Sequence, residues 1–156
     1  MARFRYSMQS ILNIKLKMET QAKQEFGAAR AALDREEEKL LRLQNRKQNY
    51  EKEAEQLLAG TLNLKAIEDN KMAILCMDDY IAAQQVCVRA AEKSLEEARE
   101  HLAQVVMERK THETLKEKAF QQFLMDEKKQ EGKEVDELTS YTYGQRKKDD
   151  RSSILI

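Results

Sequence analysis

The sequence predicts an all-α protein that folds as a long two-helix antiparallel coiled-coil hairpin. The 156 residues include no proline and only four glycines, so the chain has few places at which a helix would break. Charged residues make up 36% of the chain and aromatic residues only 6%, and most of the apolar residues are Ala, Leu, Met and Ile. Two apolar runs with helical spacing are separated by one short interruption, which indicates two helices and one turn.

The first helix is predicted over residues 5–58, because its apolar positions recur in steps of three and four, the spacing of a coiled-coil seam. From Met18 to Ala22 to Phe26 there are two successive steps of four, which predict a stutter that locally relaxes the supercoil. The predicted seam positions of this helix are Phe4, Met8, Ile11, Lys15, Met18, Ala22, Phe26, Ala29, Leu33, Glu36, Leu40, Leu43, Lys47, Tyr50, Ala54 and Leu57.

A turn is predicted at residues 59–63. Gly60 readily takes the left-handed conformation that ends a helix, and Thr61 or Asn63 can cap the next one. The second helix is predicted over residues 64–135 from the same spacing. Its predicted seam positions are Leu64, Ile67, Ile74, Met77, Ile81, Gln84, Val88, Ala91, Leu95, Ala98, Leu102, Val105, Arg109 and His112.

Two helices that each carry one apolar stripe bury it most simply against each other, and a short connection favours antiparallel neighbours. The turn then sets a register that places Phe26 opposite about Glu96 and Phe4 opposite about Lys118. We therefore assign residues 1–143 to a single hairpin and residues 144–156 to a flexible tail. A core one side chain deep leaves no cavity for a substrate.

Polar residues interrupt the predicted seam. As a default we expect them to specify the register of the coil, with their long side chains reaching outward to water. The alternative is that they keep the hairpin only marginally stable, so that it can exchange partners. These polar positions are Lys15, Glu36, Lys47, Gln84 and Arg109.

Composition argues against several classes of partner. The 28 basic and 28 acidic residues balance, so no net field would concentrate the chain on nucleic acid, and we expect no nucleic-acid partner. No apolar stretch approaches the roughly 18 residues that a membrane-spanning helix needs, and the N-terminus lacks an apolar signal segment. We therefore expect a cytoplasmic protein with no integral membrane segment.

No constellation of catalytic residues is visible in the sequence. His112-Glu113 resembles the start of a zinc-protease motif, but Lys116 stands where the second histidine belongs. The four glycines are too widely spaced to form a phosphate-binding loop. The sequence thus predicts a protein that is not an enzyme, with no catalytic residue, no metal site and no cofactor.

Large apolar residues gather where the two predicted helix ends meet. On the predicted register, residues beyond 118 have no partner in the first helix, yet Phe120, Phe123, Leu124 and Met125 follow there. One interpretation is that they close the end of the coil. The other is that, together with residues near the N-terminus, they form a docking surface. The candidate docking residues are Phe4, Tyr6, Met8, Phe120, Phe123 and Leu124.

The order and spacing of several stretches resemble the flagellar export protein family FliJ. The resemblance begins with Phe4-Arg-Tyr-Ser-Met-Gln-Ser-Ile-Leu-Asn-Ile-Lys15 and Glu19, and continues through the seam to the turn at Gly60. It resumes in residues 108–120 and in Glu134-Val-Asp-Glu-Leu138, and we expect it to stop after Tyr143.

The resemblance implies a stalk-like component of the flagellar type III export apparatus that is needed for flagellum assembly. Its expected partners are the hexameric export ATPase, the cytoplasmic domain of the membrane export gate, and export chaperones. The end that carries both termini would seat in the ATPase ring, and the protein would lie peripherally at the inner face of the cell membrane at the flagellar base. The family's gate-binding positions align approximately with Leu43, Tyr50 and Met72.

Two rival functions remain open at this point. A general coiled-coil chaperone or adaptor would use apolar residues at the ends of the coil to hold export substrates or other proteins. A membrane-surface or nucleic-acid arm would use the basic residues near the N-terminus, Arg3, Arg5, Lys15 and Lys17. Against the second rival, the apolar residues of the same stretch are already part of the predicted seam.

Overall fold

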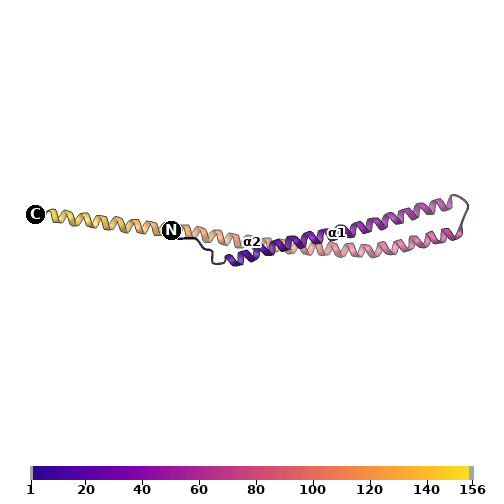
Figure 1. Ribbon diagram of the computed structural model, residues 1–156, viewed down its shortest axis with the longest axis horizontal. Helices are drawn as coiled ribbons and strands as arrows, with labels where there is room; N and C mark the ends of the chain where they lie inside the picture. Colours follow the sequence, from indigo (N-terminus) through magenta and orange to yellow (C-terminus); the bar gives the residue numbers. More distant parts are fainter. Residues whose placement is uncertain (1, 155–156) are drawn as a thin grey trace. The chain divides into compact units, whose positions relative to one another are not determined.

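The computed structural model describes residues 2–154 and contains two long helices (Figure 1). Helix α1 spans Gln9–Leu58, and helix α2 spans Leu64–Ile154. Residues 59–63 connect them, and no strand occurs between residues 2 and 154. The helices pack against each other, so the predicted all-α hairpin is confirmed.

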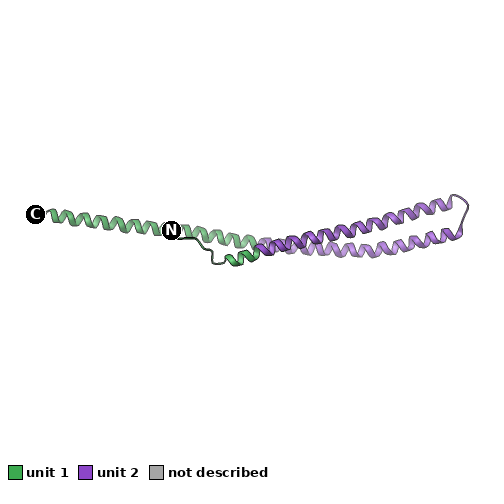
Figure 2. Ribbon diagram, viewed as in Figure 1, with its two compact units in different colours: residues 1–15, 108–156 green, residues 16–107 purple. Residues whose placement is uncertain are grey.

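The chain divides into two compact units (Figure 2). The hairpin unit is Leu16–Met107 and contains the loop between the helices. The terminal unit consists of Met1–Lys15 together with Glu108–Ile156. The stretch 1–143, which the sequence predicts as one hairpin, thus contributes to both units.

The core of the hairpin unit is the predicted seam. Leu33, Val88 and Leu95 are buried in contact with one another, and the half-buried Phe26 and Leu40 pack against them. Gln84 donates a hydrogen bond to Glu36. The predicted register places residue 86, rather than Gln84, opposite Glu36, so the observed register differs from the prediction by less than one helical turn. The core is one side chain deep, and its stability depends on continuous alternation along both helices.

Near the start of α1 the buried residues differ from the predicted seam residues. Leu12 is 4% exposed, whereas Ile11, the predicted seam residue, is 38% exposed. Glu19 is also buried, so the buried positions Leu12, Glu19 and Ala22 lie on one regular heptad stripe. The predicted stutter is therefore wrong. The heptad phase is kept with Glu19 in a seam position, where its carboxylate meets the Lys23 ammonium at 3.3 Å.

The seam of α2 also differs at two positions. Asn70 is buried and fills the gap between Ile67 and Ile74, whereas Leu64 is exposed. Asn70 is accommodated because its side-chain Nδ2 donates to the backbone carbonyl of Tyr50 at 2.9 Å. A buried amide with a partner costs far less than one without, so the polar residue can occupy a seam position.

Of the features predicted for the turn, the structure has a capping residue for α2 but not a left-handed glycine. The Oδ1 atom of Asn63 accepts a hydrogen bond from the Ala66 amide at 3.3 Å, which makes Asn63 the N-cap of α2. The left-handed conformation predicted for Gly60 is wrong, because no described glycine has a positive φ. Instead α1 closes with a tight turn in which the Ala59 amide donates to the Gln56 carbonyl at 3.2 Å.

Both helices have ends that differ from the prediction. Helix α1 begins at Gln9 rather than residue 5, since the chain before it makes a turn in which the Gln9 amide donates to the Tyr6 carbonyl. Helix α2 continues past residue 135 to Ile154, so residues 144–154, predicted as a flexible tail, are helical. The chain here holds no proline, and Gly144 lowers helix propensity by only about 1 kcal/mol. Residues 155–156 of that predicted tail lie outside the described part.

Candidate functional site

The candidate docking residues lie in the terminal unit, and the structure brings three of them into contact. The ring of Phe4 meets Phe120 edge-on, with centroids 5.2 Å apart and planes at 68°. It also meets Phe123 at 5.4 Å with a tilt of 51°. Offset and edge-to-face geometries are favoured for aromatic pairs, and all three side chains are half-buried. The phenylalanines therefore hold the N-terminal stretch against α2, which agrees with the interpretation that they close the end of the coil.

Other apolar residues of the same region remain exposed. Met8 and Leu124 are both exposed, and so is Met125, which follows Leu124 directly. Here we define the terminal face as Met8 and Leu124 together with the visible edges of the three phenylalanines. Met125 lies about 200° from Phe123 around α2 and projects away from this face. It offers apolar area beyond what the ring contacts cover, as a docking surface requires.

Basic side chains border the terminal face. An open groove is lined by Arg3, Phe4, Arg5, Tyr6, Gln9 and Lys116. The phenolic oxygen of Tyr6 is buried there, with no hydrogen-bond partner among the described residues. Three cations beside aromatic rings suit an acidic partner surface. Sequence reasoning missed Lys116, although its position one turn before Phe120 places both on the same helix face.

The candidate gate-binding residues lie in the hairpin unit but do not share one exposed surface. Leu43 and Tyr50 are half-buried in the seam of α1, whereas Met72 on α2 is exposed. Tyr50 contributes its backbone carbonyl to the buried Asn70. Of the three positions, Met72 alone offers most of its side chain to a partner.

A second apolar groove lies next to the loop of the hairpin unit. We call it the tip groove. It is lined by Ala54, Leu57, Leu58, Ile67, Asn70, Lys71, Ile74 and Leu75. Leu58 and Leu75 are well exposed although they are large and apolar. Sequence reasoning missed these two leucines because they lie outside the heptad spacing. The signal that could have found them is that this region contains more apolar residues than the seam needs.

Polar contacts across the seam set the electrostatics of the hairpin unit. Gln84 donates to the Glu36 carboxylate, and this hydrogen bond, with help from Lys39, holds the pKa of Glu36 below its ordinary value of 4.5. In a second contact between the helices, the Asp78 carboxylate accepts a hydrogen bond from the Lys47 ammonium at 2.6 Å. This hydrogen bond raises the pKa of Lys47 above its ordinary value of 10.5. These contacts join α1 to α2 at defined positions, as expected for residues that specify register.

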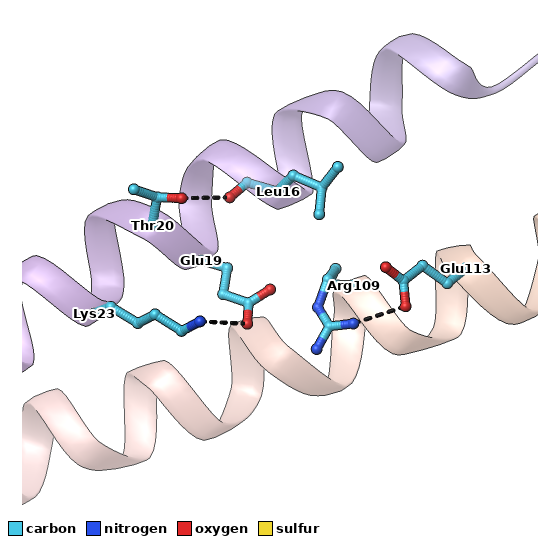
Figure 3. A network of polar contacts seen from close by, with 6 residues as sticks. All are labelled: Leu16, Glu19, Thr20, Lys23, Arg109 and Glu113. Atoms are coloured by element: carbon cyan, nitrogen blue, oxygen red, sulfur yellow. Dashed lines mark hydrogen bonds and ion pairs between the residues drawn. The ribbon is translucent and has the colours of Figure 1, made fainter.

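Further polar residues pair along their own helices. Figure 3 shows Lys23 with Glu19 on α1, and Arg109 with Glu113 on α2 at 2.7 Å. In the terminal unit, by contrast, Lys15 of α1 pairs with Glu108 of α2 at 2.8 Å. Each predicted polar seam residue is thus placed with an oppositely charged or hydrogen-bonding partner. Surface pairs of this kind contribute little individually, so their role is chiefly one of alignment.

Within the part of the chain that the structure describes, no group of three or more His, Cys, Asp or Glu side chains gathers as a metal site would require. Neither helix contains a stretch both long and apolar enough to cross a bilayer, over the residues described. The described residues do expose large apolar side chains at the terminal face and at the tip groove.

Comparison with known proteins identifies the family. The family model described as "Flagellar FliJ protein" matches residues 4–148, which is most of the chain. The chain belongs to the FliJ family. The match extends past Tyr143, where we expected the resemblance to stop. Comparison with curated proteins gives no match.

A solved structure supports the same assignment. The chain is similar to a protein of Chlamydia trachomatis, CT670, described as a YscO homolog, with a TM-score of 0.77 and 25% sequence identity. The alignment covers 94% of this chain and 99% of that one. Together, membership of the FliJ family and this likeness support a component of a type III export apparatus.

Proposed function

We propose that this FliJ-family chain is a non-enzymatic, stalk-like coiled coil that binds the hexameric flagellar export ATPase and links it to the membrane export gate and to export chaperones. In this role it is needed for flagellum assembly and lies at the inner face of the cell membrane at the flagellar base. The observation that carries the proposal is the terminal face, an exposed apolar surface with a basic border on a chain of this family.

The terminal face has the features that docking into a ring requires. The three packed phenylalanines fix the N-terminal stretch on α2, so Met8 and Leu124 are presented on an ordered surface. Preorganised apolar contacts lose little conformational entropy on binding. The cations of Arg3, Arg5 and Lys116 would steer the chain toward an acidic pore lining.

Gate binding is proposed for the hairpin unit. Met72 supplies an exposed apolar side chain, and the tip groove nearby adds Leu58 and Leu75. Leu43 and Tyr50, half-buried in the seam, would contribute their exposed edges. Two binding regions in different units would let one chain contact two partners at the same time.

Removing exposed apolar atoms from the terminal face tests the proposal. The double variant Met8→Ser, Leu124→Ser is expected to weaken binding to the purified ATPase ring about tenfold or more, since burying each side chain is worth about 1–2 kcal/mol. The packed phenylalanines are left in place, so helicity by circular dichroism stays unchanged. Binding is measured by pull-down and by titration of the ring with labelled protein.

The matched control is Leu115→Ser. Leu115 lies on the same helix and is 43% exposed, close to the 45% of Leu124. It is expected to leave ring binding unchanged. Equal loss in both variants, or no loss in the double variant, would contradict docking through the terminal face.

A general chaperone or adaptor is the second candidate, and the apolar tip groove favours it. A holdase would slow aggregation of many denatured clients, whereas a stalk protein binds folded partners selectively. Aggregation of two unrelated denatured proteins, measured by light scattering with and without this chain, separates the two functions. Protection of both clients would support the chaperone.

A further inference from the structure

The last stretch of α2, residues 128–153, is exposed at every position. A helix that packs against nothing gains no burial energy and depends on its intrinsic propensity alone. That propensity is reduced here by Gly132 and Gly144, and by β-branched Val135, Thr139 and Thr142. A helix of this composition is therefore expected to gain stability from a partner that covers it.

The residues that a partner would cover form one stripe. They line a shallow open groove along the helix, with Leu138 and Tyr143 among its exposed apolar side chains. The ammonium of Lys147 sits over the Tyr143 ring at 5.4 Å and borders the stripe. We define the C-terminal stripe as Val135, Leu138, Thr139, Thr142, Tyr143 and Arg146.

The C-terminal stripe has the same spacing in both directions. Starting from Val135, its members follow in steps of three, one, three, one and three, and the steps from Arg146 backwards are identical. An antiparallel second copy would therefore meet it position for position. Thr139 would lie opposite Thr142 at the centre of the interface, with Leu138 packed beside Thr142 of the other copy on one edge and Tyr143 beside Thr139 on the other. Apolar contact and hydroxyl pairing are both satisfied in this arrangement.

Charge is also arranged for an antiparallel partner. Residues 131–137 contain four acidic side chains and one lysine, whereas residues 145–151 contain four basic and two acidic side chains. An antiparallel copy places the acidic segment of each chain beside the basic segment of the other, while a parallel copy would place like charges together. On the register of the stripe, Asp136 of one copy lies on the same edge as Lys147 of the other and within one helical turn of it.

We propose that two copies of this chain associate as an antiparallel homodimer through the C-terminal stripe. The interface is isologous, with its two-fold axis between Thr139 and Thr142 of the paired helices. It is short, and interfaces of less than about 1,200 Å² are typically weak or transient, so the dimer is expected to form in the micromolar range.

Sedimentation velocity of the full chain over a concentration series tests the proposal. A reversible monomer–dimer equilibrium is expected, and it weakens as salt is raised. Asp136→Lys and Lys147→Glu are each expected to raise the dissociation constant about tenfold, because each puts like charges beside one another. The double variant, and an equimolar mixture of the two single variants, should both restore dimerisation.

This restoration can only be intermolecular. Residues 136 and 147 are separated by about 16 Å along one helix, so their charges do not pair within a chain. A chain that is monomeric at every concentration, or a dimer that the double variant fails to restore, would overturn the proposal. So would a monomeric chain whose stripe gains hydrogen-exchange protection only when the ATPase ring is added, since the ring would then be the partner.

A second pair of variants tests the stripe itself. Tyr143 and Tyr141 are two residues apart and similarly exposed, at 63% and 66%, but only Tyr143 belongs to the stripe. Tyr143→Ser is expected to weaken the dimer, and Tyr141→Ser to leave it unchanged. Equal effects of the two would contradict the assigned face. Since the experiment contains no ATPase, its outcome is independent of docking through the terminal face.

Discussion

Helix α2 is stabilised differently in two regions of its length. In the hairpin unit its seam residues Met77, Val88 and Leu95 are buried against α1, and Gln84 is hydrogen-bonded across the seam. Over residues 128–153 no side chain is even half-buried. Both stretches are rich in charged residues. The difference teaches that the apolar seam, and not the general composition, determines which part of this helix is held by tertiary contacts.

Replacing one leucine in each of these two regions of α2 should reveal this difference most strongly. Leu95 is 8% exposed and Leu138 is 66% exposed, and both lie on α2. Leu95→Ala is expected to lower the free energy of unfolding by about 2–3 kcal/mol, because it leaves a cavity in a core one side chain deep. Leu138→Ala is expected to change it by less than about 0.5 kcal/mol.

Urea denaturation followed by circular dichroism at low protein concentration measures both variants, so that any association through the C-terminal stripe does not contribute. Similar losses of unfolding free energy in the two variants would mean that residues 128–153 are held by contacts within the chain, and would contradict the difference between the two regions.

Replacing a glycine in the hairpin unit or in residues 128–153 is expected to stabilise the helix that contains it, by less than Leu95→Ala destabilises the fold. Gly27 on α1 and Gly144 on α2 are both helical, and a methyl group at either would meet nothing within 4 Å. Gly27→Ala is expected to raise the global free energy of unfolding by about 1 kcal/mol through helix propensity. Gly144→Ala should instead slow hydrogen exchange only in the residues around it. A global gain from Gly144→Ala would show that the end of α2 unfolds together with the hairpin unit.

The smallest expected effect is a pH dependence in the hairpin unit. The pKa of Glu36 is held below 4.5 by Gln84 and Lys39, so the ionised carboxylate stabilises the fold above that pH. This contribution is lost as the pH falls through the lowered pKa. Wild type should therefore exceed Glu36→Gln in melting temperature near neutral pH, and the gap should close on acidification.

The control for this titration is Glu37→Gln, at an exposed position next to Glu36. It leaves the hydrogen bond between Gln84 and Glu36 in place, and it is expected to lower the melting temperature near neutral pH less than Glu36→Gln does. A gap between wild type and Glu36→Gln that widens as the pH falls would reverse the sign of the argument.

Much of the fold follows from the apolar spacing. The all-α hairpin, the position of the turn and most seam residues from Phe26 onward are predicted by steps of three and four. Within the seam, two failures occur where polar residues occupy seam positions. Glu19 and Asn70 are buried, yet their type argues against a core position, and only the continuing heptad phase indicates them. Their partners, Lys23 and the Tyr50 carbonyl, depend on geometry that spacing alone does not contain.

The candidate surfaces were less predictable than the fold. An excess of large apolar residues near Phe120 indicates that the region differs from a simple seam. It does not reveal that Phe4, Phe120 and Phe123 pack together while Met8 and Leu124 stay exposed. That division depends on the path of the nonhelical residues before Gln9, which carry no periodic pattern. The gate-binding positions came from resemblance alone, and their binding role stays a prediction.

The central functional claim is tested most directly by the ATPase rate of the purified hexameric export ATPase, measured with and without this chain at equal ionic strength and paired with a pull-down. We predict that the chain co-purifies with the ring and stimulates hydrolysis, and that stimulation falls in the Met8→Ser, Leu124→Ser variant but not in Leu115→Ser. A ring that neither binds the chain nor changes its rate would contradict the account.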